Sequence, residues 1–202
     1  LNLTHYIQWQ KAALLLSQNP ELSPAHIKSI LLDHSKKWKW LQDAIPSGCY
    51  LDLSKSLDFA SNCVVADVTG KGEILLSKID HLGKISLLKD GDGYGYTKTE
   101  SGSAIAIKIN GVHVGISSND GWSILGAETV SGVNQLIWGH TDGRFFACDL
   151  NEDWEYARGS LISGSDFYDK EVSFNQDFNN DGVAGEPLTT VESSGEISLL
   201  KD

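Results

Sequence analysis

The sequence predicts an α+β protein in which an N-terminal helical segment of two to three helices precedes a β-rich antiparallel module. Two observations predict this division. Apolar residues recur at three- and four-residue spacings up to about residue 60, which is the period of a helix. From residue 83 onward they alternate with polar residues, and turn signals divide the chain into short strands. With 202 residues, the chain is long enough for one or two domains with cores of their own.

The first helix is predicted over residues 4–18, and Asn19-Pro20 ends it because a residue before proline avoids the helical conformation. A second helix follows, with Ser23 as its N-cap and Pro24 at its first position. The stretch LDLSKSLDFA from Leu51 predicts one more short helix. Residues 1–62 are therefore expected to be helical, and residues 63–82 are expected to be a linker that passes into strands.

The clearest hairpin of the β-rich module surrounds Asn110-Gly111, a pair that readily adopts positive φ. This turn pairs Ile109 with Val112 and predicts that the alternating apolar side chains of both strands face a core. Further turn signals at 119–121, 131–132 and 142–143 separate three more strands.

Three tryptophans, Trp122, Trp138 and Trp154, recur at 16-residue intervals. Large aromatic side chains usually fill the core of a small β domain, so we expect core positions for Trp122 and Trp138. Trp154 lies in the acidic stretch NEDWEY, and we expect it to be partly exposed. A carbohydrate-binding module could use Trp154 and Tyr156 as ligand-binding residues.

An acidic stretch near the end of the chain, residues 165–186, predicts a short helix capped by Ser165 and an oxygen-rich turn. The turn matches the first half of a calcium loop, although Leu188 stands where the loop requires a bidentate Glu. The predicted Ca²⁺ ligands are Asp177, Asn179, Asp181, the carbonyl of Val183, and Glu186. The alternative is an Asx-rich turn closed by Gly182, with no metal.

The charge is unevenly distributed along the chain. Residues 1–60 hold six Lys and five acidic residues, a balance of +1, whereas the remainder holds ten Lys or Arg against 22 acidic residues, a balance of −12. The acidic part argues against nucleic acid and anionic membranes as partners, and it suits cations and an extracellular or cell-surface setting. No apolar run is long enough to predict a membrane span.

Three cysteines leave the redox compartment open, because a disulfide between Cys49 and Cys63 would leave Cys148 unpaired. The chain opens with Leu1 and contains no Met, so we expect it to be a piece of a longer product.

An internal repeat predicts how the chain is divided into repeated units. The stretch GKISLLKD at 83–90 returns as GEISLLKD at 195–202, offset by 112 residues. Residues 83–194 are therefore predicted to be one unit of a tandem array, and residues 195–202 the start of a second unit. An adjacent repeat in a longer parent chain is an expected partner.

The stretch AALLLSQNPELSPAHIKSILLDHSKK, followed by GCYLDLSKSLDFA, resembles the C-terminal end of a subtilisin-like (peptidase S8) serine protease domain. The position of the family's nucleophilic serine falls near Asn2, and its Asp and His lie on strands that this chain lacks. The resemblance therefore implies no catalytic residue here, since a serine nucleophile needs a base and an oxyanion hole. The segment is either a non-catalytic remnant or the C-terminal piece of an active secreted endopeptidase encoded upstream.

The stretches GYGYTKT, AIKINGVHVG, GWSILGAETVSGVNQLIWGHTDGRFFACDLNEDW and FNQDFNNDGVAG resemble the tryptophan-rich C-terminal repeat module of large secreted bacterial proteins. Ala147-Cys148 occupies a segment that often carries another Trp in that family. The resemblance implies an extracellular accessory module without enzymatic activity. We therefore expect a Ca²⁺-binding module for surface attachment, adhesion or spacing, with a surface glycan or a protein as its ligand.

Overall fold

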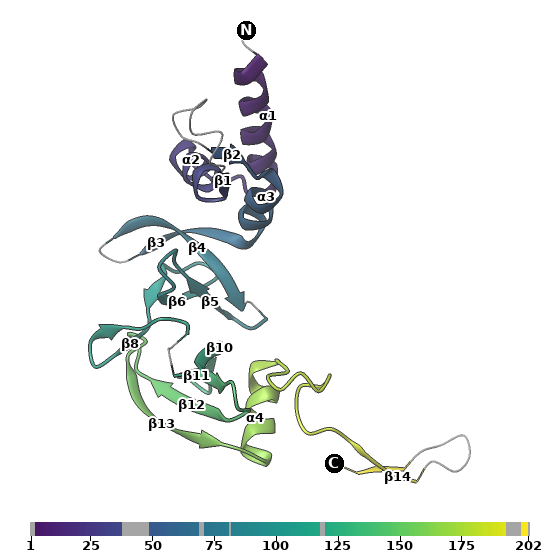
Figure 1. The fold of residues 1–202 in the computed structure, drawn as a ribbon. Coiled ribbons are helices and arrows are strands. Elements are labelled where there is room, and N and C mark those ends of the chain that lie inside the picture. Colours follow the sequence, from purple (N-terminus) through teal and green to yellow (C-terminus); the bar gives the residue numbers. More distant parts are fainter. Residues whose placement is uncertain are drawn as a thin grey trace. The chain divides into compact units, whose positions relative to one another are not determined.

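A computed structural model of the chain describes residues 3–37, 49–68, 71–80, 82–117, 120–192 and 199–201 (Figure 1). Within these residues the chain divides into two compact units. Unit 1 comprises Leu1–Ala66 and Glu73–Ser77, and unit 2 comprises Asp67–Gly72 and Lys78–Asp202. The boundary passes through two strands, β3 (Cys63–Val68) and β4 (Gly72–Asp80).

The structure is mostly β, with 42% strand against 25% helix, so the predicted α+β class is wrong. Part of the reason lies in residues 63–82, which were expected to pass from a linker into strands and of which β3 and β4 occupy the greater part. β3 has the sequence CVVADV, whose β-branched residues suit a half-buried strand better than a linker. β4 extends over nine residues, GEILLSKID.

Besides its parts of β3 and β4, unit 1 contains three helices and one small strand pair. They are α1 (Leu3–Gln18), α2 (Pro24–Asp33), α3 (Leu53–Asn62), β1 (Ser35–Lys37) and β2 (Cys49–Leu51). The predicted cap of the second helix is confirmed, because the backbone N–H of His26 donates to Ser23 Oγ at 3.2 Å, with Pro24 at the first helical position.

The core of unit 1 is small, and its buried members are Leu15, Leu22, Ile27, Ile30, Ala60 and Cys63. Leu14, Leu16 and Leu32 are exposed on the same helices. Several apolar positions of α1 and α2 are thus not covered by the part of the chain that the structure describes. The side chain of Cys49, the position of Asn2 and residues 195–198 lie outside the described residues, so the disulfide, the serine position and the start of the second repeat stay predictions.

Unit 2 contains a series of short antiparallel strands, one helix and a hairpin. The strands are β5 (Ile85–Lys89), β6 (Gly95–Thr99), β7 (Ile105–Ala106), β8 (Lys108–Ile109), β9 (Val112–His113), β10 (Trp122–Val130), β11 (Val133–His140), β12 (Phe145–Leu150) and β13 (Tyr156–Ile162). They are followed by α4 (Ser165–Phe174), β14 (Thr189–Glu192) and β15 (Leu199–Lys201), of which β14 and β15 pair with each other.

The predicted hairpin turn is confirmed, since Asn110 and Gly111 adopt φ values of 53° and 75° and Ile109 pairs with Val112. The expectation that all its apolar side chains face a core is wrong. Ile107 is fully buried, whereas the Val112 side chain is 66% exposed. Only two residues on each side form the strand pair, Lys108 with His113 and Ile109 with Val112.

The four strands β10–β13 form an antiparallel meander in which each strand pairs with the next (Figure 1). Alternate residues point to opposite faces of a strand, and both faces of this sheet are covered. One face contributes to the first core, whose buried members are Ile85, Leu87, Ile107, Ile116, Ile124, Ala127, Leu136, Cys148, Leu150 and Trp154. The other face contributes to the second core, built on Ile137 and on Phe167, Phe174 and Phe178 from α4 and the loop after it.

The segment that follows α4 docks on an irregularity in β10. A register shift between Ile124 and Gly126 leaves the Leu125 carbonyl free of the ladder, and Gln176 Nε2 donates to it at 3.3 Å. A Cβ on Gly126 would lie 2.8 Å from Gln176 Oε1 and 3.0 Å from the Phe178 ring, so any other residue would force both side chains to shift. The helix itself begins after Gly164, which makes no side-chain cap, so the prediction of Ser165 as the N-cap is wrong.

Candidate functional site

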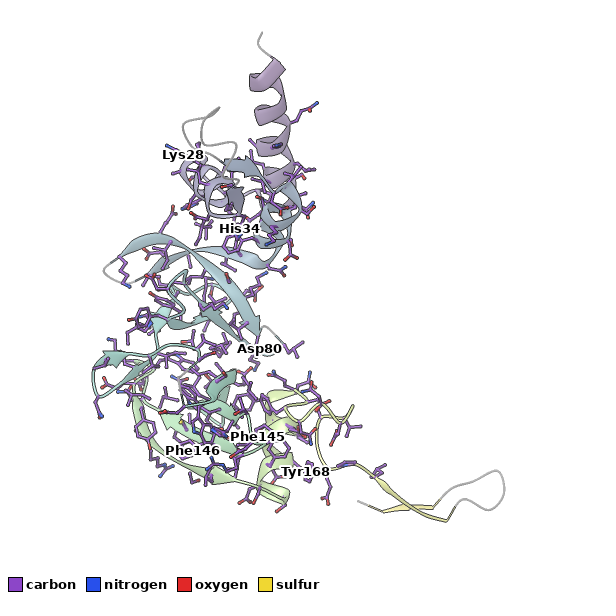
Figure 2. All side chains as sticks on the ribbon, in the orientation of Figure 1. Lys28, His34, Asp80, Phe145, Phe146 and Tyr168 are labelled. Carbon is purple, nitrogen blue, oxygen red and sulfur yellow. The ribbon has the colours of Figure 1, made fainter. Side chains whose placement is uncertain are left out.

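The most distinctive concave surface of unit 2 is a cavity of about 420 Å³, which we call the aromatic hollow. Its lining residues are Ile109, Trp122, Trp138, Phe146, Cys148 and Tyr156. Trp138 of β11 lies directly opposite Phe146 of β12, and the Trp122 ring meets Phe146 edge-on at 6.3 Å between centroids. Figure 2 labels Phe145 and Phe146 on β12 and Tyr168 on α4; Phe145 and Tyr168 pack against the second core.

Glycine at position 159 makes room for the wall of the aromatic hollow. Gly159 pairs with Cys148 across β12 and β13. A Cβ at this position would lie 2.4 Å from Cε1 of Phe146 and 2.7 Å from the carbonyl oxygen of Ala147. The Phe146 ring therefore occupies the space that any other side chain at position 159 would need.

The three tryptophans are buried in the opposite order from that predicted. Trp154, expected to be partly exposed, is only 4% exposed and belongs to the first core, whereas Trp122 and Trp138 are half-buried and line the aromatic hollow. Trp154 adopts a φ of 56° in a turn where Asn151 Oδ1 accepts from the N–H groups of Asp153 and Glu155. This turn directs the indole ring inward. Tyr156 lines the aromatic hollow, and its role in ligand binding stays a prediction.

Charged side chains stand beside Trp122. The Arg144 guanidinium lies 5.5 Å from the centre of the Trp122 ring, within the range of a cation–π interaction. Arg144 Nε donates to Asp142 Oδ2 at 2.9 Å, and His140 Nδ1 lies 2.6 Å from Asp142 Oδ1. The charges at this side of the aromatic hollow therefore neutralise one another.

Cys148 contributes a neutral group to the aromatic hollow. Burial raises the pKa of its thiol to about 12, and a hydrogen bond from Trp138 acts in the opposite direction. The thiol is therefore protonated at any physiological pH, which makes it a poor nucleophile and a poor metal ligand.

A second cavity, of about 610 Å³, lies between β11–β13 and α4 and is lined by polar groups. Lys170 Nζ donates to Gln135 Oε1 at 2.8 Å, and Gln135 Nε2 donates to Asp149 Oδ1 at 2.7 Å. Arg158 Nε donates to the other Asp149 oxygen at 2.8 Å, and this hydrogen bond is the main reason that the pKa of Asp149 lies below its usual value. These hydrogen bonds connect α4 with β11, β12 and β13, so we interpret them as a brace between sheet and helix.

The predicted calcium loop forms a compact series of Asx turns. Asp177 Oδ1 and Oδ2 accept from the N–H groups of Asp181 and Gly182 at 3.2 and 2.8 Å. Asn179 Nδ2 donates to Asp181 Oδ2 at 2.9 Å, and Val183 N donates to Asp181 Oδ1 at 3.1 Å. The structure thus brings Asp177, Asn179 and Asp181 into one turn. Glu186 is exposed beyond it.

No cluster of three or more His, Cys, Asp or Glu side chains suited to a metal is found among the described residues. A calcium ion in this loop would therefore need amide and backbone carbonyl oxygens beside the carboxylates of Asp177 and Asp181. Calcium accepts such mixed oxygen ligands.

Glu171 of α4 organises this loop, and the sequence analysis missed it. Its side chain is fully buried. Oε1 accepts from the N–H groups of Phe178 and Asn179 at 2.8 and 3.3 Å, and Oε2 accepts from Gly185 at 3.1 Å. One carboxylate therefore fixes the loop at both ends. A signal was present in the sequence, because Phe167, Glu171 and Phe174 share the apolar face of the helix.

Residues 85–185 match the family described as the tryptophan-rich Synechocystis species C-terminal domain. The chain belongs to this family. The match begins with β5 and ends at Gly185, the last residue that Glu171 holds. The predicted resemblance to a tryptophan-rich module is thereby confirmed. None of the curated proteins and none of the solved structures matches the chain.

The family match leaves the subtilisin-like resemblance of the first 60 residues untested, so it stays a prediction. In the part of the chain that the structure describes, no helix combines the length and apolarity needed to cross a membrane.

Replacing Glu171 with Gln is expected to lower the free energy of unfolding by about 1–3 kcal/mol, because one buried N–H of the loop loses its acceptor. Urea unfolding followed by fluorescence measures this difference. Glu152→Gln, which alters an exposed carboxylate, serves as the matched control. Equal stability of the two variants would contradict the role given to Glu171.

The thiol of Cys148 is expected to resist alkylation by iodoacetamide in the folded chain between pH 7 and pH 10, as measured by peptide mass mapping. An unfolded thiol ionises near pH 8.5, roughly its ordinary pKa, whereas the folded thiol has a pKa of about 12. Ionisation therefore favours the unfolded state, and stability should fall as the pH rises above about 8.5. Rapid labelling of the native chain with an inflection near that pH would contradict the burial of this thiol.

Proposed function

We propose that this chain is a non-catalytic accessory module of a secreted bacterial protein, used for attachment to a surface outside the cell. The aromatic hollow is the observation that carries the proposal. Large aromatic side chains normally complete a core, and a group of them left partly open on a two-sided sheet is typical of an interaction site. The acidic balance of the chain suits an extracellular setting.

The parent of the module is proposed to be subtilisin-like. The exposed Leu14, Leu16 and Leu32 of α1 and α2 support this, because helices that belong to a larger domain leave apolar side chains open when described by themselves. The reading frame upstream distinguishes two possibilities for the parent. The C-terminal piece of an active serine endopeptidase requires a G-T-S-M-A-T-P motif there, whereas a non-catalytic remnant does not.

Calcium is proposed to bind in the loop formed by residues 177–186. Support comes from the three oxygen-bearing side chains of Asp177, Asn179 and Asp181 in one turn, and from Glu171, which holds that turn in place without a metal. A loop without metal is the alternative, because the same oxygens accept hydrogen bonds from N–H groups of the loop itself and these bonds also account for its shape. Thermal melting separates the two.

We expect the melting midpoint to be higher in excess Ca²⁺ than in EDTA, and the double variant Asp177→Ala/Asp181→Ala to lose the difference. A site present only in the native state stabilises by RT ln(1 + [L]/Kd), about 2.7 kcal/mol at a hundredfold excess over Kd. The control Glu152→Ala/Asp153→Ala removes two exposed carboxylates from another turn and should keep the calcium effect. No calcium-dependent shift in the unaltered chain would reduce the loop to an Asx turn.

Attachment is tested with fluorescently labelled chain added to intact cells of the species that encodes it. We expect saturable binding to the cell surface that falls at least tenfold in Tyr156→Ala, which removes one wall of the aromatic hollow. Tyr94→Ala is the control, since Tyr94 is an exposed tyrosine outside the hollow. Binding that both variants retain would remove the aromatic hollow from the proposed function.

A further inference from the structure

The aromatic hollow has the size and the lining of a site for a small planar ligand. Its volume of about 420 Å³ lies within the range of roughly 300–1,000 Å³ that is usual for small-molecule sites. Four of its six lining side chains are aromatic, and they come from the four strands β10–β13 of one sheet. Flat rings of this kind stack on flat ligand faces.

The charges around the aromatic hollow favour an uncharged ligand. The chain carries a net charge of −11 and repels polyanions. Arg144, the cation beside Trp122, is already paired with Asp142. An acidic polysaccharide would therefore meet net repulsion without a free cation among these residues to compensate it.

The lining also restricts which sugars fit. It offers few polar atoms, chiefly the neutral Cys148 thiol and the Tyr156 hydroxyl. A sugar whose axial hydroxyl pointed at the floor would leave that hydroxyl without a partner, which is unfavourable. In β-1,4-linked glucose or N-acetylglucosamine all ring substituents are equatorial, so both ring faces present C–H groups and every hydroxyl points sideways.

We propose that the aromatic hollow binds an uncharged β-1,4-linked pyranose chain, stacked on Trp122, Trp138 and Tyr156 with its hydroxyls directed to solvent and to the Arg144–Asp142 pair. This inference rests on the proposed function, because it names the surface component to which the module attaches.

Two other ligands fit less well. A quaternary ammonium group is attracted to aromatic faces, but it would fill only part of the cavity. A proline-rich peptide docks in extended aromatic grooves, and here the aromatic residues gather in one short hollow. Both are outcomes of the test.

Calorimetric titration of the full chain with cellotetraose and with chitotetraose tests the inference. We expect saturable binding of at least one of them, at least tenfold weaker in Tyr156→Ala, unchanged in Tyr94→Ala and retained in Tyr156→Phe, which keeps the ring. Circular dichroism checks folding, and Trp122→Leu replaces Tyr156→Ala if that variant does not fold.

The inference is overturned if neither sugar binds, if Tyr156→Ala and Trp122→Leu bind as tightly as the unaltered chain, or if only maltotetraose, choline or decaproline binds. The cell-binding experiment distinguishes failure of the proposed ligand class from failure of the proposed attachment function. Cell binding that depends on Tyr156 without binding of either β-1,4-linked sugar overturns the ligand class and leaves the attachment function standing.

Discussion

The alternation of side chains along β12 is the constraint on which the rest of unit 2 depends. Phe145 and Ala147 face the second core beneath α4, whereas Phe146 and Cys148 face the first core and the aromatic hollow. A shift of register by one residue would exchange the two sets and leave neither face able to pack. The turns at Gly132 and Gly143, which adopt φ values of 82° and 91°, keep the neighbouring strands in that register.

The two candidate sites depend on opposite faces of this one sheet. On one face, the second core anchors α4, and α4 presents the buried Glu171 carboxylate to the loop that carries Asp177 and Asp181. On the other face, Phe146 occupies the space left by Gly159 and forms a wall of the aromatic hollow. A polar loop and an apolar hollow are thus both positioned by rigid strands, which suits a module that attaches without changing shape.

Local signals in the sequence predicted the local structure well. The Asn110-Gly111 turn, the Ser23 cap and the run of Asx turns after Asp177 each follow from a few adjacent residues. The errors concern residues whose surroundings come from distant segments. Trp154 is buried because the Asn151 turn directs it under strands that lie far away in the sequence, although its immediate neighbours are acidic.

The fold class and the role of Glu171 were not predicted for the same reason, because both depend on contacts beyond the adjacent residues. The β-branched residues of β3 favour a strand, but they do not show which strands it joins. The apolar face shared by Phe167, Glu171 and Phe174 indicates that Glu171 is buried, but it does not show which backbone N–H groups the carboxylate binds.

We infer that the two-faced sheet β10–β13 is the rigid foundation of the module. Hydrogen exchange of backbone amides tests it most directly. We expect the amides of Leu136–Trp138 and Phe146–Cys148 to exchange most slowly and those of α1–α3 in unit 1, with its smaller core, to exchange faster. Protection of α1–α3 equal to that of β11 and β12 would contradict it.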